Sequence, residues 1–208
     1  MTPGSERATV RRRVLSAPCP ISAVSYQRFF QTSGGGVTIS GGEPTLFMPF
    51  LSSLLKRLKA ADLHTLIETN GRFNLADFRK SVLPYTDMIY MDMKIHDRQQ
   101  HKRFCGVYND VIMTNFIALH RMSESGTFTI LPRTPLIPGI TDTEDNIRAL
   151  AHFYQSSGVT RTAVLKSNPL WSDKHDKLGL DLPRPQPPRK LYDSSRLHEL
   201  VDIFAEYG

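Results

Sequence analysis

Cysteine is scarce in this sequence, and long apolar runs are missing. Cys19 and Cys105 are the two cysteines among 208 residues. Two cysteines so far apart in the sequence do not form the disulfide framework of a secreted protein. Such sparse usage is typical of a reducing compartment, so the sequence predicts a cytoplasmic protein. No apolar stretch approaches the roughly 20 residues of a transmembrane helix, and we expect no membrane partner. With 40% hydrophobic residues, the chain can still form the core of one domain.

Acidic residues are scarce at the start of the chain, where basic residues collect. Residues 1–28 contain Glu6 as their single acidic residue, against Arg7, Arg11, Arg12, Arg13 and Arg28, within a net charge of +6. The segment lacks the hydrophobic core and the cleavage pattern of a targeting peptide. It also lacks a basic stripe interleaved with aromatic residues, so we predict no nucleic-acid partner. Residues 1–28 are therefore expected to form a disordered basic leader.

The rest of the chain alternates between strand-like and helix-like segments. The hydrophobic pattern predicts strands at residues 37–40, 64–71, 87–94, 127–139 and 161–169. It predicts helices at residues 47–62, 75–83, 109–126, 141–158 and 194–208, with an extended proline-rich loop at residues 172–193. Strands that alternate with helices in this way indicate an α/β fold with a parallel sheet.

Polar residues follow the apolar part of every predicted strand. In a parallel barrel, functional side chains collect at the carboxyl ends of the strands. Read in order, these ends are Gly41-Gly42-Glu43, Glu68-Thr69-Asn70, Asp92-Met93-Lys94, Arg133-Thr134 and Lys166-Ser167-Asn168. Strand periodicity places Asp92 and Lys94 on the face opposite Met91 and Met93, so both charges point into the barrel if the methionines face the helices. The alternative is that Asp92 and Lys94 pair only with each other.

The stretch from Gly34 to Glu43 has glycines on both sides of one short strand. It has neither the Gly-Lys-Ser/Thr ending of a phosphate-binding loop nor the GxGxxG spacing of a dinucleotide site. Open backbone groups beside Glu43 suit an ammonium group better than a phosphate, which Glu43 would repel. Two alternatives remain: a turn capped by Glu43, and an unrelated phosphate-binding barrel enzyme.

Several motifs occur together in a recognisable order. "SGGGVTISGGEPTLF", "IETNG", "MDMK", "HKRFCGVYN" and "PLIPGITD" resemble the glycyl-radical-enzyme activating enzymes of the radical S-adenosylmethionine (SAM) superfamily, from about residue 29 to residue 208. The resemblance implies a partial (β/α)6 barrel that binds SAM and a [4Fe–4S] cluster. It also implies an oxidoreductase that cleaves SAM to a 5′-deoxyadenosyl radical, which removes a hydrogen from a backbone glycine of a partner enzyme.

The resemblance also assigns roles to individual residues. Gly41, Gly42 and Glu43 would meet the amino group of SAM, and Lys94 would contact its carboxylate. The methionyl end of SAM, and a monovalent cation, would be lined by Glu68, Thr69 and Asp92, with Asn70 beside them; Arg133 and Asn168 would make further SAM contacts. The implied partners are a glycyl-radical enzyme and a flavodoxin- or ferredoxin-type reductant.

Two departures from the family pattern matter. No CxxxCxxC motif is present, although three such thiolates hold the cluster in this family. We therefore expect a truncated barrel that lacks its first strand and cluster loop, with Cys105 as a small structural residue and Cys19 as a weak candidate ligand. No histidine stands near Asn168, which argues against assuming that the partner is pyruvate formate-lyase.

The alternative function is a non-catalytic remnant that binds SAM or a partner protein without a cluster. An open barrel would also expose a sheet edge, which predicts marginal solubility.

Overall fold

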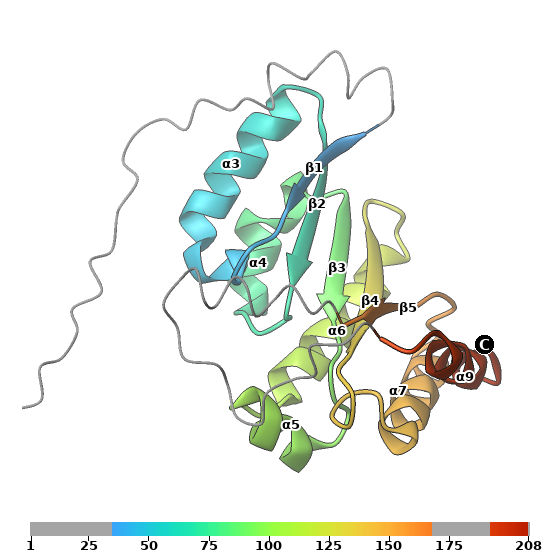
Figure 1. Cartoon of the computed structure of the whole chain (residues 1–208). Helices are drawn as coiled ribbons and strands as arrows, with labels where there is room; N and C mark the ends of the chain where they lie inside the picture. The colour runs from blue at the N-terminus through green and yellow to red at the C-terminus, as the bar shows by residue number, and fades with distance from the viewer. Residues whose placement is uncertain (1–34, 168–191, 208) are drawn as a thin grey trace, which may run out of the picture.

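Five parallel strands form a curled half-barrel, seen in the computed structural model of the chain (Figure 1). The structure describes residues 35–167 and 192–207. In those residues the sheet order follows the chain: β1 (Gly36–Ile39), β2 (His64–Thr69), β3 (Met88–Asp92), β4 (Thr129–Leu136) and β5 (Ala163–Lys166). Every neighbouring pair is parallel. This arrangement confirms the predicted partial barrel.

A helical segment follows each strand, as predicted. The short helix η1 (Pro44–Phe47) leads into α3 (Met48–Ala60), and α4 (Leu75–Ser81) leads into η2 (Leu83–Tyr85). The later helices are α6 (Asp110–Ser123), α7 (Glu144–Ser156) and α9 (Ser194–Ala205). In the part of the chain that the structure describes, no helix combines the length and apolar character needed to cross a bilayer. The predicted leader and most of the predicted proline-rich loop lie outside the described residues.

One helix, α5 (Arg98–Cys105), was not predicted from the sequence. Its residues are almost all polar, and His101 is the one that it buries, so it lacks the apolar stripe that marks a helix in a sequence. Its ends are well defined. The carboxylate of Asp97 accepts a hydrogen bond of 2.7 Å from the Gln100 N–H at the start, and Gly106 adopts a left-handed conformation (φ 77°) at the end.

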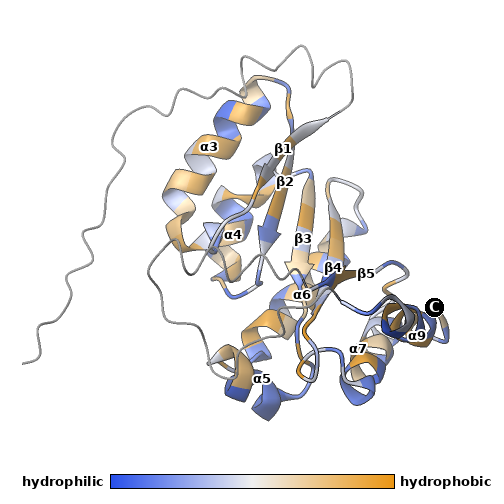
Figure 2. Cartoon of the chain, in the orientation of Figure 1, coloured by the Kyte–Doolittle hydropathy of each residue, from blue (hydrophilic) through white to orange (hydrophobic). Residues whose placement is uncertain are grey.

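The core lies between the sheet and its helices. Ile89, Met91 and Met93 are at most 2% exposed and pack in one cluster with residues of α3, α4, α6 and α7. The hydropathy colouring shows apolar residues on parts of β3, β4, α3 and α6 (Figure 2). Met91 in β3 and Met93 just after it therefore face the helices, which confirms the predicted direction of these side chains. Tyr90 and Asp92 consequently lie on the inner, concave face.

Strand β4 continues past the two residues that the sequence placed at its carboxyl end. The sequence placed Arg133 and Thr134 at its end, but β4 continues to Leu136, so that prediction was wrong. The reason is a second neighbour: residues Arg133–Leu136 pair with Ala163–Lys166 of β5 after the preceding residues have paired with β3. Register brings Arg133 directly opposite Asp92, the last residue of β3. Arg133 therefore reaches the same edge of the sheet from within its strand.

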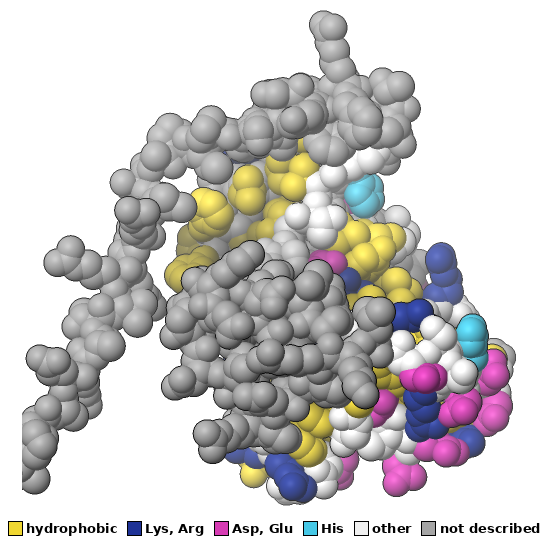
Figure 3. Space-filling view, viewed as in Figure 1, with side chains coloured by type: hydrophobic (Ala, Val, Ile, Leu, Met, Phe, Trp, Pro, Cys, Tyr) yellow, Lys and Arg dark blue, Asp and Glu magenta, His cyan; other side chains and the backbone are white. Residues whose placement is uncertain are grey.

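An apolar patch remains on the surface at the start of α3. Leu46, Phe47 and Phe50 are 71%, 60% and 64% exposed. Hydrophobic side chains gather along α3 on the face shown in the space-filling view (Figure 3). Three large apolar side chains this close together form a contiguous patch, which is more informative than scattered exposed leucines.

Candidate functional site

The carboxylate of Glu43 joins the end of β1 to the end of β2. Its Oε1 accepts hydrogen bonds from the Thr45 N–H (3.2 Å), the Thr45 hydroxyl (2.7 Å) and the Thr69 hydroxyl (2.8 Å). Its Oε2 accepts one from the Asn70 N–H (2.7 Å). The capping role that the sequence left open is therefore present, and Glu43 in addition braces the two strand ends against each other.

The glycine pair before Glu43 lies open at this edge. Gly41 adopts φ +125°, a conformation that side chains rarely allow, and a Cβ at Gly41 or Gly42 would meet nothing within 4 Å. Both residues are exposed. Both glycines are therefore open to the surface just beyond the carboxyl end of β1.

Arg133 connects three strands across the concave face. Its Nη1 donates to Oε1 of Glu68 at 2.6 Å, and its Nη2 donates to Oδ1 of Asp92 at 2.9 Å. The guanidinium carbon lies 4.9 Å from the centre of the Tyr90 ring, and the whole residue is 8% exposed. On the other side, the Ser40 hydroxyl donates to Oε2 of Glu68 at 2.6 Å. The structure thus brings together three predicted site residues from β2, β3 and β4.

The charges in this group stabilise one another. Burial raises the pKa of Glu68, but hydrogen bonds from Ser40 and Arg133 and the charge of Arg133 outweigh it, so the pKa lies below its ordinary value. Burial lowers the pKa of Arg133, but Glu68 and Asp92 raise it by more, so the pKa of Arg133 lies above its ordinary value. Both side chains are consequently charged near neutral pH. The alternative in which Asp92 pairs with Lys94 is wrong, because Asp92 pairs with Arg133.

Lys94 follows β3 and keeps its ammonium available. Among the described residues, no carboxylate lies within 4 Å of its Nζ, and its side chain is half-buried. The positive charge of Lys94 also acts on Cys105. Burial raises the pKa of the Cys105 thiol, and the charge of Lys94 partly offsets that rise. An ammonium without a carboxylate partner can bind an anion.

Asn70 and Asn168 complete the predicted set. The Asn70 side-chain oxygen accepts a hydrogen bond from the Arg72 N–H at 2.9 Å, which fixes the turn after β2. Asn168 lies outside the described residues. Sequence reasoning missed Ser40, whose position next to the glycine pair is the one signal that could have indicated it. It also missed two buried asparagines, Asn109 and Asn146, which hold the loop after β3.

The described residues do not fit a metal cluster. Within residues 35–167 and 192–207, no group of three or more His, Cys, Asp or Glu side chains could hold a metal ion. Cys105 is the cysteine of this part of the chain, and burial keeps its thiol protonated, which disfavours it as a ligand. Cys19 lies outside the described residues.

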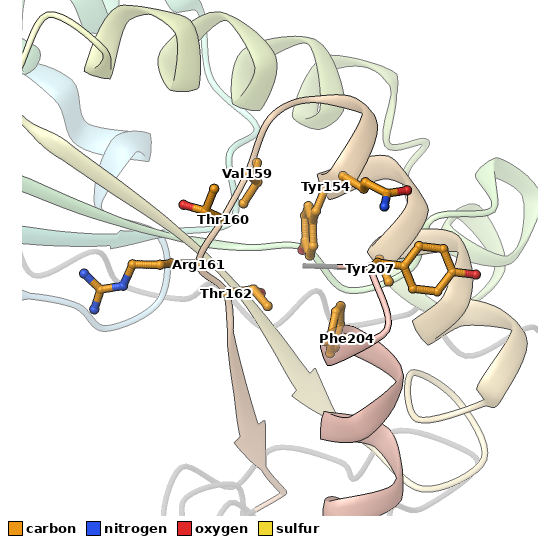
Figure 4. Close-up of a pocket in the computed structure, with 9 residues that line it drawn as sticks. Tyr154, Val159, Thr160, Arg161, Thr162, Phe204 and Tyr207 are labelled. Carbon is orange, nitrogen blue, oxygen red and sulfur yellow. The ribbon is translucent and has the colours of Figure 1, made fainter.

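One cavity lies near the carboxyl ends of the strands and another lies away from them. A cleft of about 710 Å³ lies between α5, α7 and the loops after β3 and β4, within the size range of small-molecule sites. Its lining includes His96, Arg103, Ile140 and Asn146. A second pocket, of about 40 Å³, lies between α7, α9 and the segment before β5, away from the carboxyl ends of the strands (Figure 4). The second pocket is too small for a nucleoside.

Comparison with known proteins gives a consistent family. The indoleacetate decarboxylase activating enzyme of Tractidigestivibacter scatoligenes is 36% identical over 176 residues, which are 84% of this chain and 53% of that enzyme. The 4-hydroxyphenylacetate decarboxylase activating enzyme of Clostridium scatologenes is 35% identical over 147 residues, which are 71% of this chain and 46% of that enzyme. The chain thus spans about half the length of the curated relatives it matches. No family model matches the chain.

A solved structure shares the fold. The crystal structure of a domain of pyruvate-formate lyase-activating enzyme from Bacteroides vulgatus superposes with a TM-score of 0.61 at 26% identity, covering 84% of this chain and 96% of that domain. The sequence relatives and the structural neighbour are all named as activating enzymes, and the neighbour shares the fold of the parallel half-barrel. The chain is therefore a homologue of glycyl-radical-enzyme activating enzymes, and its fold matches a solved domain of one of them.

Proposed function

We propose that the chain binds SAM at the carboxyl ends of its strands and is the barrel of an activase that generates a glycyl radical on a partner enzyme. One observation carries the proposal most directly. The open Gly41–Gly42 backbone and the Lys94 ammonium without a carboxylate partner lie at the same edge of the sheet. Together they complement a ligand with one ammonium and one carboxylate, as in the methionyl end of SAM.

Each predicted site residue has a role in this proposal. Backbone groups of Gly41 and Gly42 accept from the ammonium of SAM, while Lys94 pairs with its carboxylate. Glu43 holds the glycine turn against β2 through the Thr69 hydroxyl and the Asn70 N–H. Glu68, Asp92 and Arg133 form the charged wall beside the methionyl group, where Asn168 would add a contact. Because Arg133 already pairs with both carboxylates, we propose no monovalent cation there.

The radical chemistry itself belongs to the bound groups. The superfamily implies SAM together with a [4Fe–4S] cluster, which supply the 5′-deoxyadenosyl radical when both are bound. The described residues offer no ligands for that cluster, so we derive no step through it. What these residues contribute is the binding and orientation of SAM.

The proposed partners follow from the relatives. Two of these are named as activating enzymes of indoleacetate and 4-hydroxyphenylacetate decarboxylases, so the partner of this chain is proposed to be a glycyl-radical enzyme, with a decarboxylase as the first candidate. A flavodoxin- or ferredoxin-type reductant would deliver the electron, and the reaction would take place in the cytoplasm.

Isothermal titration calorimetry of the 208-residue chain with SAM tests the binding. We expect saturable binding at one site that inorganic phosphate does not compete with, and a strong loss of affinity in Lys94→Met. Absence of binding in the wild type, or competition by phosphate, contradicts the proposal and favours a phosphate-binding barrel enzyme.

A second measurement separates the activase from a remnant that binds SAM without a cluster. Anaerobic reconstitution with iron and sulfide is followed by absorbance and electron paramagnetic resonance spectroscopy. A [4Fe–4S] spectrum on this chain excludes the remnant. Persistent failure to reconstitute, with SAM binding intact, favours the remnant for the chain as it stands.

A further inference from the structure

The backbone immediately after β3 is held by a buried asparagine of α7. The Nδ2 of Asn146 donates to the carbonyl oxygen of Lys94 at 3.0 Å, and its Oδ1 accepts from the N–H of His96 at 2.9 Å. Asn146 is 8% exposed, so these bonds form largely out of water. A single side chain therefore fixes the peptide groups on both sides of Ile95.

A second buried asparagine acts on the same segment. Asn109, at the start of α6, donates from Nδ2 to the carbonyl oxygens of Ile95 (3.0 Å) and His96 (2.8 Å), and it is 3% exposed. With Asn146, it satisfies three successive carbonyls from Lys94 to His96. We call Asn109 and Asn146 the asparagine clamp.

Asn146 also links the clamp to the next strand. The same Nδ2 donates to the carbonyl oxygen of Thr141, in the loop after β4, at 2.8 Å. The amide thus ties the loop that carries Lys94 to the loop that follows the Arg133 strand. Such fully satisfied buried amides specify one arrangement of the backbone, whereas an apolar side chain would leave these carbonyls unpaired.

We propose that Asn146, assisted by Asn109, is a positioning residue that sets where the Lys94 ammonium meets the carboxylate of the ligand. The inference rests on the proposed function, because it assumes that Lys94 binds the carboxylate of SAM. Lysine has a long flexible side chain, so a charge-assisted contact at a defined place requires its backbone to be fixed. The clamp supplies that fixation at the Lys94 carbonyl itself.

The test compares SAM with decarboxylated SAM, which lacks only the carboxylate. In the wild type we expect a preference for SAM of about tenfold to a hundredfold, as a charge-assisted hydrogen bond provides. In Asn146→Ala we expect this preference to fall to about threefold or less, with the affinity for decarboxylated SAM changed little. A merely structural role would weaken binding of both ligands equally and leave the preference unchanged.

Two further variants make the result specific. Asn115→Ala is the matched control, because Asn115 is also a buried helix asparagine (4% exposed) that donates to two backbone carbonyls, those of Gly71 and Phe73, both at 2.9 Å. It should keep the preference for SAM. In a Lys94→Met background, Asn146→Ala should cause no further loss of preference, because Asn146 acts through Lys94.

Asn109→Ala provides a second route if Asn146→Ala does not fold. It removes the bonds to Ile95 and His96 and should lower the preference in the same direction. Hydrogen exchange of the ligand-free proteins gives an independent measurement: the His96 amide should exchange faster in the clamp variants than in Asn115→Ala.

The outcomes separate the two proposals. If the wild type binds neither ligand, the SAM site is overturned, and hydrogen exchange alone decides whether the clamp fixes this segment. If the wild type prefers SAM and the clamp variants keep that preference, or if His96 exchange is unchanged, the positioning role is overturned while the SAM site stands.

Discussion

At the scale of single residues, Arg133 is the centre of the charged group on the concave face. It bridges Glu68 and Asp92, whose side chains are 28% and 24% exposed, while its own side chain is 10% exposed. The carboxylates keep some contact with water, so each pair is worth less than a fully buried one. Removal of the guanidinium nevertheless leaves two carboxylates without a cationic partner, and Glu68 then keeps only the hydrogen bond from Ser40.

We expect Arg133→Met to lower the free energy of unfolding by about 2 kcal/mol near neutral pH. Because the folded pKa of Glu68 lies below its ordinary value, its contribution is present in full above the unfolded pKa of about 4.3 and is lost as pH falls through the folded pKa. The difference between variant and wild type should therefore shrink as pH falls below about 4. Urea denaturation across this pH range measures it.

Arg148→Met is the matched control for this prediction. Arg148 also pairs with two carboxylates, Glu144 and Glu206, but its side chain is 40% exposed and its partners are 55% and 57% exposed. Exposed pairs contribute little, so the control should change stability by less than about 1 kcal/mol. Equal losses in the two variants would contradict the view that burial makes the Arg133 group strong.

The sequence predicted part of this group, and the reason is geometric. Alternation along β3 indicated the direction of Asp92, and the ends of β2 and β3 indicated where Glu68 would lie. The partner of both could not be predicted, because it depends on the register of β4, and Arg133 lies inside that strand. Asn109 and Asn146 were missed for a related reason: a buried polar residue in a helix carries no periodic signal, and its partners lie far away in the sequence.

At the scale of elements, α5 is a helix that its hydrophobic pattern does not predict but its capping residues do. The helix buries little, so its existence depends on its caps rather than on packing. Asp97 at its start and Gly106 just past its end are the residue types that helix termini prefer, and both were visible in the sequence. The amphipathic helices α3, α6, α7 and α9 were predicted because each buries an apolar stripe.

We expect Gly106→Ala to destabilise the protein by about 1 kcal/mol, because φ is 77° and a Cβ in that conformation is strained. A Cβ at this position would meet nothing within 4 Å, so the cost comes from the backbone alone. Gly106→Asn should cost less, since asparagine tolerates left-handed backbone better than alanine does. Urea denaturation of both variants measures the order.

Gln99→Ala serves as the control within the same helix. Gln99 is exposed, and alanine suits a helix interior, so stability should stay within about 0.5 kcal/mol of the wild type. If alanine at residue 106 were tolerated as well as alanine at residue 99, the left-handed cap would not be what ends α5.

At the scale of the whole molecule, two features favour self-association. Strand β1 stands first in the sheet order, so among the described residues its outer edge has no neighbouring strand. Leu46, Phe47 and Phe50 expose a contiguous apolar patch just beyond the same strand. An unpaired edge beside an apolar patch is a recognised route to association between chains.

We therefore expect the 208-residue chain to form concentration-dependent oligomers, as the prediction of marginal solubility from the sequence also requires. The double variant Phe47→Glu/Phe50→Glu adds two charges to the patch and should shift the chain toward monomer. Val111→Glu/Val201→Glu adds the same charge at positions that are 50% and 41% exposed on α6 and α9, and it should leave association unchanged. Light scattering coupled to size-exclusion chromatography, over a series of concentrations, measures the mass of each protein.

A wild type that stays monomeric and melts cooperatively would show that neither the edge of β1 nor the apolar patch drives association. Equal relief by both double variants would show that net charge, rather than this patch, controls it.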